Sequence, residues 1–209
     1  MTLNNRQSFS GQRGAVGFWF ALLLALWGAT VLAAGRLGLF SRFPLLAIPP
    51  MVVCGVVLPV LAYYAYRPFR AFISTCDLRA LTLFHVWRIP AALTFFAYGS
   101  HHLLPPRFVF NAGWGDLIVG LLAPIVQVLP ASRRSYLTFH LFGLADFVVA
   151  VGTGLLFTLL RVPLMENITT FPVVLIPLYG VCVTGALSIM TLDRLLRGRR
   201  AEHLLEETP

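Results

Sequence analysis

Six polar side chains interrupt the apolar stretches of this sequence, and their types are those that could do chemistry in a dry environment. They comprise two imidazoles, one guanidinium, two carboxyls and one amide: His85, Arg88, Asp116, Gln127, His140 and Asp146. Imidazole and carboxyl groups take up and release protons, whereas a guanidinium keeps its charge. Charged groups inside a bilayer are costly and mark ion pairs, proton relays or solute sites. These six residues are therefore the candidate functional set.

The spacing of these residues predicts how they pair. His85 and Arg88 are three residues apart, so they share one face of a helix. We expect Asp146 to lie deepest of the carboxylates and to pair with Arg88 directly or through water. Asp116 is expected at the external start of its own helix, where an acidic side chain caps the first turn. It would then pair with backbone groups or an external residue.

Small residues accompany both aspartates at helical spacing. One stripe follows the spacing i, i+4, i+7, i+11 and consists of Asp116, Gly120, Ala123 and Gln127; the other consists of Gly143, Asp146, Ala150 and Thr153. Small residues let helices approach closely, and polar ones hydrogen-bond across the interface. Both stripes are therefore predicted to face protein.

The sequence also bears on three further kinds of chemistry, namely haem ligation, metal binding and catalysis. His85 and His140 each lie four residues into an apolar stretch from the same side, and histidine pairs at equal depth can hold haem. The three cysteines show no CxxC or Cys/His spacing, which argues against a metal site. HExxH and GxSxG motifs are absent from the sequence, which favours a role other than catalysis.

The elements that must position these residues are membrane-spanning helices. The chain has 209 residues, of which 58% are hydrophobic and only 11% charged. Six apolar runs approach the roughly 20 residues that a spanning helix needs. They lie at about residues 15–33, 45–66, 81–104, 113–129, 136–160 and 171–192. The first run is longer than the apolar part of a usual signal peptide, so we expect it to be an uncleaved anchor. The sequence thus predicts an all-α polytopic bundle in a single membrane domain, 1–209.

The arginines predict the orientation of this bundle. If the N-terminus is inside, eleven of the sixteen arginines lie in cytoplasmic segments and four in external ones. This excess favours both termini inside and an even number of spans. Lysine is absent, a coding bias typical of a bacterium, so we expect the bacterial cytoplasmic (inner) membrane. The net charge of +8 then reflects topology, and we expect no nucleic-acid partner.

Two polar segments lie outside the spans, one between the second and third spans and one after the sixth. Residues 67–79 place polar and apolar side chains on opposite helix faces and predict an amphipathic helix in the cytoplasmic interface, with an ordinary loop as the alternative. Residues 193–209 are the expected cytoplasmic tail. Its basic part is expected to meet anionic lipid headgroups through Arg194, Arg197, Arg199 and Arg200.

A set of short motifs runs from the third span to the sixth. It consists of His85, Arg88, Gly99, Leu104-Pro105, Phe108, AGWGD at 112–116, Gly120, Ala123-Pro124, His140, Gly143, Asp146, Ala150, Phe171-Pro172 and LIP at 175–177. In these motifs the sequence resembles a group of small uncharacterised bacterial integral membrane proteins over about residues 80–190, the first two spans being uncovered. The resemblance implies no activity or ligand, only that this polar set is typical of such proteins.

These features leave several functions open. The first is transport or conduction of a small solute or protons along the polar residues of spans three to five, for which a homo-oligomer could help to enclose the path. The second is an accessory or structural membrane subunit whose polar residues only specify packing. The third is a haem-binding redox protein using His85 and His140. An enzyme acting on lipid-soluble substrates has the least support.

Overall fold

The computed structural model describes residues 3–129 and 132–206. Throughout this part the chain is helical, without a β-strand. Six helices in it are long and apolar enough to cross a membrane: Gly14–Arg36, Leu45–Ala65, Leu78–Ser100, Pro106–Val128, Arg133–Leu159 and Ile176–Gly198. The side chains of Arg6, Arg13, Arg199 and Arg200, which entered the arginine count, lie outside this description, as does the end of the expected tail at 207–209.

The chain forms eight α-helices within the described ranges. Their bounds are α1 Leu3–Arg36, α2 Ile48–Ala65, α3 Arg67–Thr75, α4 Leu78–Leu83, α5 Arg88–Ser100, α6 Pro106–Val128, α7 Arg133–Leu159 and α8 Cys182–Glu206. The short helix η3, Phe84–Trp87, joins α4 to α5 so that they form one span. A π-helical turn, η5, Ile176–Val181, leads into α8. The other short helices are η1 Phe40–Arg42, η2 Leu45–Ala47 and η4 Met165–Thr169.

Local sequence explains where several helices begin. The Asp77 side chain caps α4 by accepting a hydrogen bond from the backbone N–H of Arg79, and Ser132 caps α7 in the same way through Ser135. Helix α6 begins at Pro106, because proline suits the first position of a helix, where no N–H partner is needed. That start lies seven residues before the predicted one at 113.

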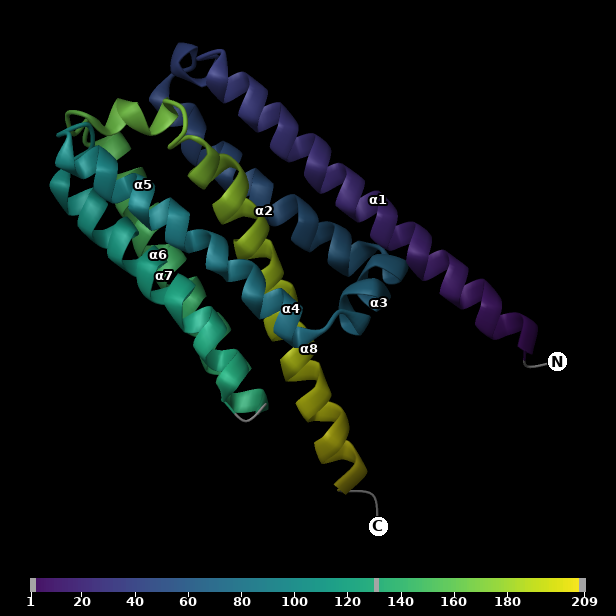
Figure 1. The fold of residues 1–209 in the computed structure, drawn as a ribbon. Coiled ribbons are helices and arrows are strands. Elements are labelled where there is room, and N and C mark those ends of the chain that lie inside the picture. The colour runs from purple at the N-terminus through teal and green to yellow at the C-terminus, as the bar shows by residue number, and fades with distance from the viewer. Residues whose placement is uncertain (1–2, 130–131, 207–209) are drawn as a thin grey trace.

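The helices are arranged around α8 (Figure 1). The sixth span, which α8 forms with η5, is the most buried of the six, and the span in α1 is the least buried. Helix α5 packs on α6, and α6 packs on α7. The first turn of α1 and the last turn of α8 lie at the same end of the bundle, which we call the termini end.

The outer surface of the bundle is apolar. Every spanning helix carries a large hydrophobic side chain that is more than half exposed: Leu23, Leu58, Leu93, Phe110, Val148 and Leu196. A water-soluble protein seldom exposes so continuous an apolar surface. The surface is compatible with a multi-pass membrane protein.

The segment between the second and third spans contains a helix, but it is shorter than the predicted 67–79. Helix α3 ends at Thr75, because Asp77 caps the start of α4. The apolar face of α3 is covered by protein: Phe69 and Ile73 are buried, and the Phe69 ring lies 5.0 Å from that of Phe20 on α1. Arg194 of α8 donates to the Ile73 and Cys76 carbonyl oxygens, so this arginine has protein partners.

Candidate functional site

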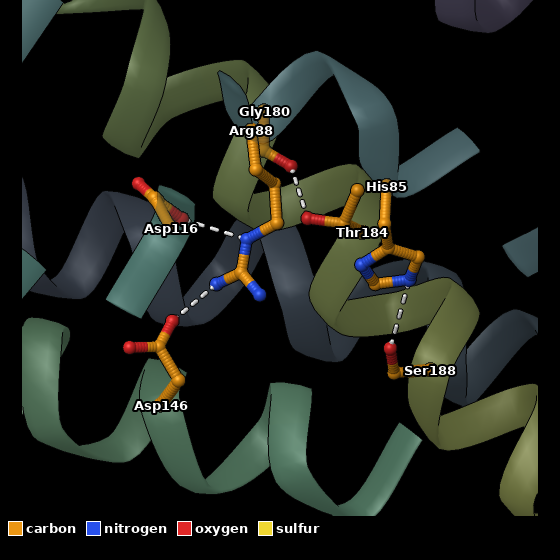
Figure 2. Close-up of polar contacts among 7 residues, drawn as sticks. All are labelled: His85, Arg88, Asp116, Asp146, Gly180, Thr184 and Ser188. Atoms are coloured by element: carbon orange, nitrogen blue, oxygen red, sulfur yellow. Dashed lines mark hydrogen bonds and ion pairs between the residues drawn. The ribbon is translucent and has the colours of Figure 1, made fainter. Parts of the chain in front are cut away.

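Arg88 is the centre of a buried charge cluster. Its side chain is fully enclosed, and it donates from Nε to Asp116 Oδ1 and from Nη2 to Asp146 Oδ2, each at 2.6 Å. The two aspartates come from α6 and α7, so the cluster joins three spans (Figure 2). We call Arg88, Asp116 and Asp146 the triad. The predicted contact between Arg88 and Asp146 is confirmed.

The expectation for Asp116 is wrong. Asp116 does not pair with backbone or an external residue, but with the same arginine as Asp146. The reason is the early start of α6: Asp116 lies ten residues after Pro106, about 15 Å along the helix. Arg88 likewise lies ten residues after Leu78. Both therefore lie near the middle of helices that are long and apolar enough to cross a membrane.

Glycines make room for the triad. A Cβ atom at Gly115 would overlap Asp146 Oδ1, and one at Gly120 would lie 3.0 Å from the backbone nitrogen of Ile89, next to Arg88. Gly143 lies beside Arg88 as well, since its Cβ would lie 3.6 Å from Nη1. The small-residue stripes of α6 and α7 therefore face protein at the triad, as their spacing predicted.

An aromatic ring completes the enclosure of Arg88. The guanidinium carbon lies 4.0 Å from the centroid of the Phe147 ring, a cation–π contact. The third guanidinium nitrogen, Nη1, is buried and has no hydrogen-bond partner among the described residues. The guanidinium is thus fixed by two carboxylates and a ring, with one nitrogen unused.

The charges of the triad do not balance. Two carboxylates face one guanidinium, which would leave one negative charge if both were ionised. An unpaired charge in a low-dielectric interior is costly, and such a group takes up a proton or a counterion instead. The arrangement can therefore hold one proton or one small cation.

A second polar cluster lies beside the triad, toward the termini end. The Ser188 hydroxyl lies 3.2 Å from His140 Nδ1 and 3.3 Å from His85 Nε2. Thr82 Oγ1 lies 3.4 Å from His140 Nε2. All four residues are fully buried. Figure 2 shows His85 and Ser188 on the opposite side of Arg88 from the two aspartates.

The two histidines do not fit a haem held between them. Their ring centroids lie 5.4 Å apart and their planes are inclined by 71°, so they meet edge to face. His85 Nε2 and His140 Nδ1 contact the same Ser188 hydroxyl. A haem with two axial histidines needs its macrocycle between the ligating nitrogens, and this contact leaves no slot for it. We therefore do not assign haem to this pair.

Gln127 lies apart from the triad. It is eleven residues along α6 from Asp116, about 16 Å at 1.5 Å per residue. Its Nε2 donates to the Ala123 carbonyl oxygen at 3.4 Å, and its Oε1 is buried without a partner among the described residues. The structure therefore brings together five of the six candidate residues and leaves Gln127 out.

A cavity adjoins the triad on the side away from the histidines. Its volume is about 70 Å³, and its wall is formed by α2, α5, α6, α7 and the segment 165–181. Among the described residues Asp116 is the one charged side chain on this wall. Asp116 is therefore the member of the triad that a solute in the cavity would meet.

Sequence reasoning missed Ser188, which joins the two histidines. The sequence did contain a signal for it, because Thr184, Ser188 and Thr191 follow one another at the helical spacing i, i+4, i+7. In the structure all three side chains are fully buried. Thr82 gave no comparable signal, since it stands alone at the start of its span. Phe147 is indistinguishable by sequence from the other phenylalanines.

Comparison with known proteins identifies a family and no activity. No curated protein and no solved structure matches the chain. The family model described as "Domain of unknown function (DUF8737)" matches residues 45–196. The match includes the second span, which the resemblance left out, as well as the triad, the histidines and Ser188. Since it extends over more than half of the sequence, the chain belongs to the DUF8737 family.

Proposed function

We propose that this protein moves protons across the bacterial cytoplasmic membrane and that the triad is the site that holds the proton. The observation that carries the proposal is the charge count: Asp116 and Asp146 both contact Arg88 in the middle of the bundle. A structural ion pair needs one carboxylate for each guanidinium. The second carboxylate gives the triad a group that takes up and releases a proton.

Polar features extend from the triad toward both ends of the bundle. Toward the termini end, His85, Ser188, His140 and Thr82 follow one another at 3.2 to 3.4 Å. Hydroxyl and imidazole groups both donate and accept protons, so this series can pass one along. In the other direction, the cavity extends from Asp116 toward the opposite end of the bundle.

Arg88 argues against an open proton channel. A fixed positive charge in a pore is a barrier to passing protons. We therefore propose that the triad binds a proton from one side and releases it to the other. Under this proposal the histidine side faces the cytoplasm, which is the orientation that the arginine distribution favours.

Vesicles containing the purified protein and a pH-sensitive dye test the proposal. With a potassium gradient and valinomycin, we expect faster proton entry than in protein-free vesicles. Asp116→Asn and Asp146→Asn should each slow this entry by about tenfold or more, because a positioned proton-transfer group contributes about 10²–10⁴-fold.

The matched control removes a polar contact between the same two helices. Asn111 Nδ2 donates to Thr153 Oγ1 at 3.0 Å across α6 and α7. Asn111→Ala should leave proton entry unchanged. Proton entry at the rate of protein-free vesicles, or at the wild-type rate in both aspartate variants, would reject the proposal.

An accessory or structural membrane subunit is the second candidate. Arg88 has no exposed surface and is clamped against Phe147, which suits a group that only locks helices together. Under this alternative the aspartate variants would change stability, and no proton movement would be seen with any variant.

A further inference from the structure

We infer that the cavity beside Asp116 binds a small alkylammonium cation. This inference rests on the proposed function, because it assigns the solute that competes with the proton at the triad. It is carried by the chemistry of the cavity wall, by the cavity's size and by the unbalanced charge of the triad.

The wall of the cavity suits an organic cation. Three phenyl rings, those of Phe95, Phe108 and Phe147, line it together with the Asp116 carboxyl. Ammonium groups bind to carboxylates and to the faces of aromatic rings, and their alkyl parts suit apolar walls. Phe147 already holds the guanidinium of Arg88 in this way.

Inorganic cations have too few ligands in the cavity. Hard metal cations need several oxygen ligands. The wall offers the Asp116 carboxyl and the Thr158 hydroxyl, and that hydroxyl donates to the Gly154 carbonyl at 2.8 Å. The remaining lining is almost wholly apolar, so binding should discriminate against sodium.

The volume restricts the cation to a small one. The cavity measures about 70 Å³. A buried apolar cavity of about 150 Å³ is enough to admit benzene. Methylammonium is therefore of suitable size, whereas tetraethylammonium is too large.

The cavity also has a route to the surface. Leu155 of α7 lines it and is 41% exposed, and Pro49 of α2 lines it and is partly exposed. The cavity therefore reaches the surface between α2 and α7. A cation can enter there without passing the histidines.

The exchange balances in charge and in atoms. Before binding, the triad holds one guanidinium, one carboxylate and one carboxylic acid, which together are neutral. When methylammonium enters, the Asp116 carboxylic acid loses its proton to water and the carboxylate pairs with the cation. The site is again neutral, and one proton is released for each cation bound.

Binding to the purified protein in detergent tests the inference with two measurements. Methylammonium chloride should raise the unfolding temperature above that in equal sodium chloride, because a ligand that binds only the folded state stabilises it. In weakly buffered solution it should also release protons. Tetraethylammonium chloride should do neither.

Three variants locate the site. Asp116→Asn should lower the affinity for methylammonium by about tenfold or more and abolish proton release, because a charged hydrogen bond is lost. Ala150→Leu places a larger side chain on the cavity wall and should weaken binding similarly. Ala145→Leu is the same change on the exposed face of α7 and should bind like wild type.

The outcomes separate this inference from the proposed function. Equal unfolding temperatures in methylammonium and sodium chloride, or wild-type binding by Ala150→Leu, would overturn the inference while proton entry into vesicles could persist. If Ala150→Leu fails to fold, binding of tetraethylammonium as strong as that of methylammonium by the wild type would overturn it. Binding without any proton movement in vesicles would leave the cation site standing and reject the transport function.

Discussion

Asp146 of α7 occupies the space beside Gly115 of α6 that any other residue would fill with its Cβ atom. This contact brings the carboxyl close to the backbone of the neighbouring helix while Oδ2 still reaches Arg88. The position of Asp146 on α7 therefore depends on residue 115 of the neighbouring helix α6 being a glycine, which has no side chain.

Gly115→Ala should displace Asp146 from Arg88. The added methyl group forces the carboxyl or the helices apart, and overpacking of this kind costs about 1–3 kcal/mol. We expect a lower unfolding temperature in detergent, and in vesicles we expect proton entry to be slowed as it is by Asp146→Asn. Gly152→Ala on α7 is the control, because a Cβ there meets nothing within 4 Å. Equal stability of the two glycine variants would contradict this account of the contact.

Because two carboxylates share one guanidinium, the double aspartate variant should lose much more stability than the two single variants together. Asp116→Asn or Asp146→Asn leaves one carboxylate with one guanidinium, so each should cost little. The double variant leaves Arg88 buried without a carboxylate and should lose about 3–5 kcal/mol. Thermal unfolding in detergent measures the difference. Additive losses would show that the two aspartates do not share the arginine.

Ser188→Ala should destabilise the bundle by about 1–2 kcal/mol, because His85 and His140 each lose a buried contact. Thr191→Val is the control one turn further along α8, since Thr191 Oγ1 is buried without a hydrogen-bond partner in the described structure. That change should be neutral or stabilising. If both variants unfold at the wild-type temperature, Ser188 does not hold the histidines.

Cysteine labelling tests the proposed orientation. Arg134 and Glu166 are exposed at opposite ends of the bundle, and a cysteine at 166 should react with an impermeant maleimide on intact cells whereas one at 134 should not. The unmodified protein is the control. It has three cysteines of its own. Cys182 is buried, Cys54 is exposed on the apolar span Leu45–Ala65, away from both ends of the bundle, and burial raises the pKa of the Cys76 thiol, which lowers its reactivity. Labelling of the cysteine at position 134 from outside the cell would contradict the proposed orientation and support the opposite one.

Hydropathy was sufficient to find the six apolar helices, because a spanning helix must satisfy its backbone within an apolar segment. The pairing of Arg88 with Asp146 could be predicted because the two residues lie at similar depths in their spans, counted from the same side. The start of α6 was missed, since Arg107 and Asn111 made its first turns look like a loop. This one error moved Asp116 to the membrane surface and hid the triad.

The contacts around the histidines could not have been found in the same way. Ser188 lies 103 residues from His85 in the sequence and contacts it only because α8 passes through the centre of the bundle. Apolar spacing shows that a helix has a buried face, but it does not show which other helix covers that face. Three-dimensional packing decided this partner.

Arg88 and Asp116 belong to consecutive spans joined by the short segment 101–105, whereas Asp146 lies one span later. During synthesis, the hairpin of α5 and α6 can therefore enter the membrane with its two charges already neutralising each other. Asp146 arrives afterwards, at an arginine that already has a counterion, and it must enter the bilayer as an uncharged acid. The order of the helices along the chain thus lets a balanced ion pair form first, and the second carboxyl then brings in the one proton that the two aspartates share around Arg88.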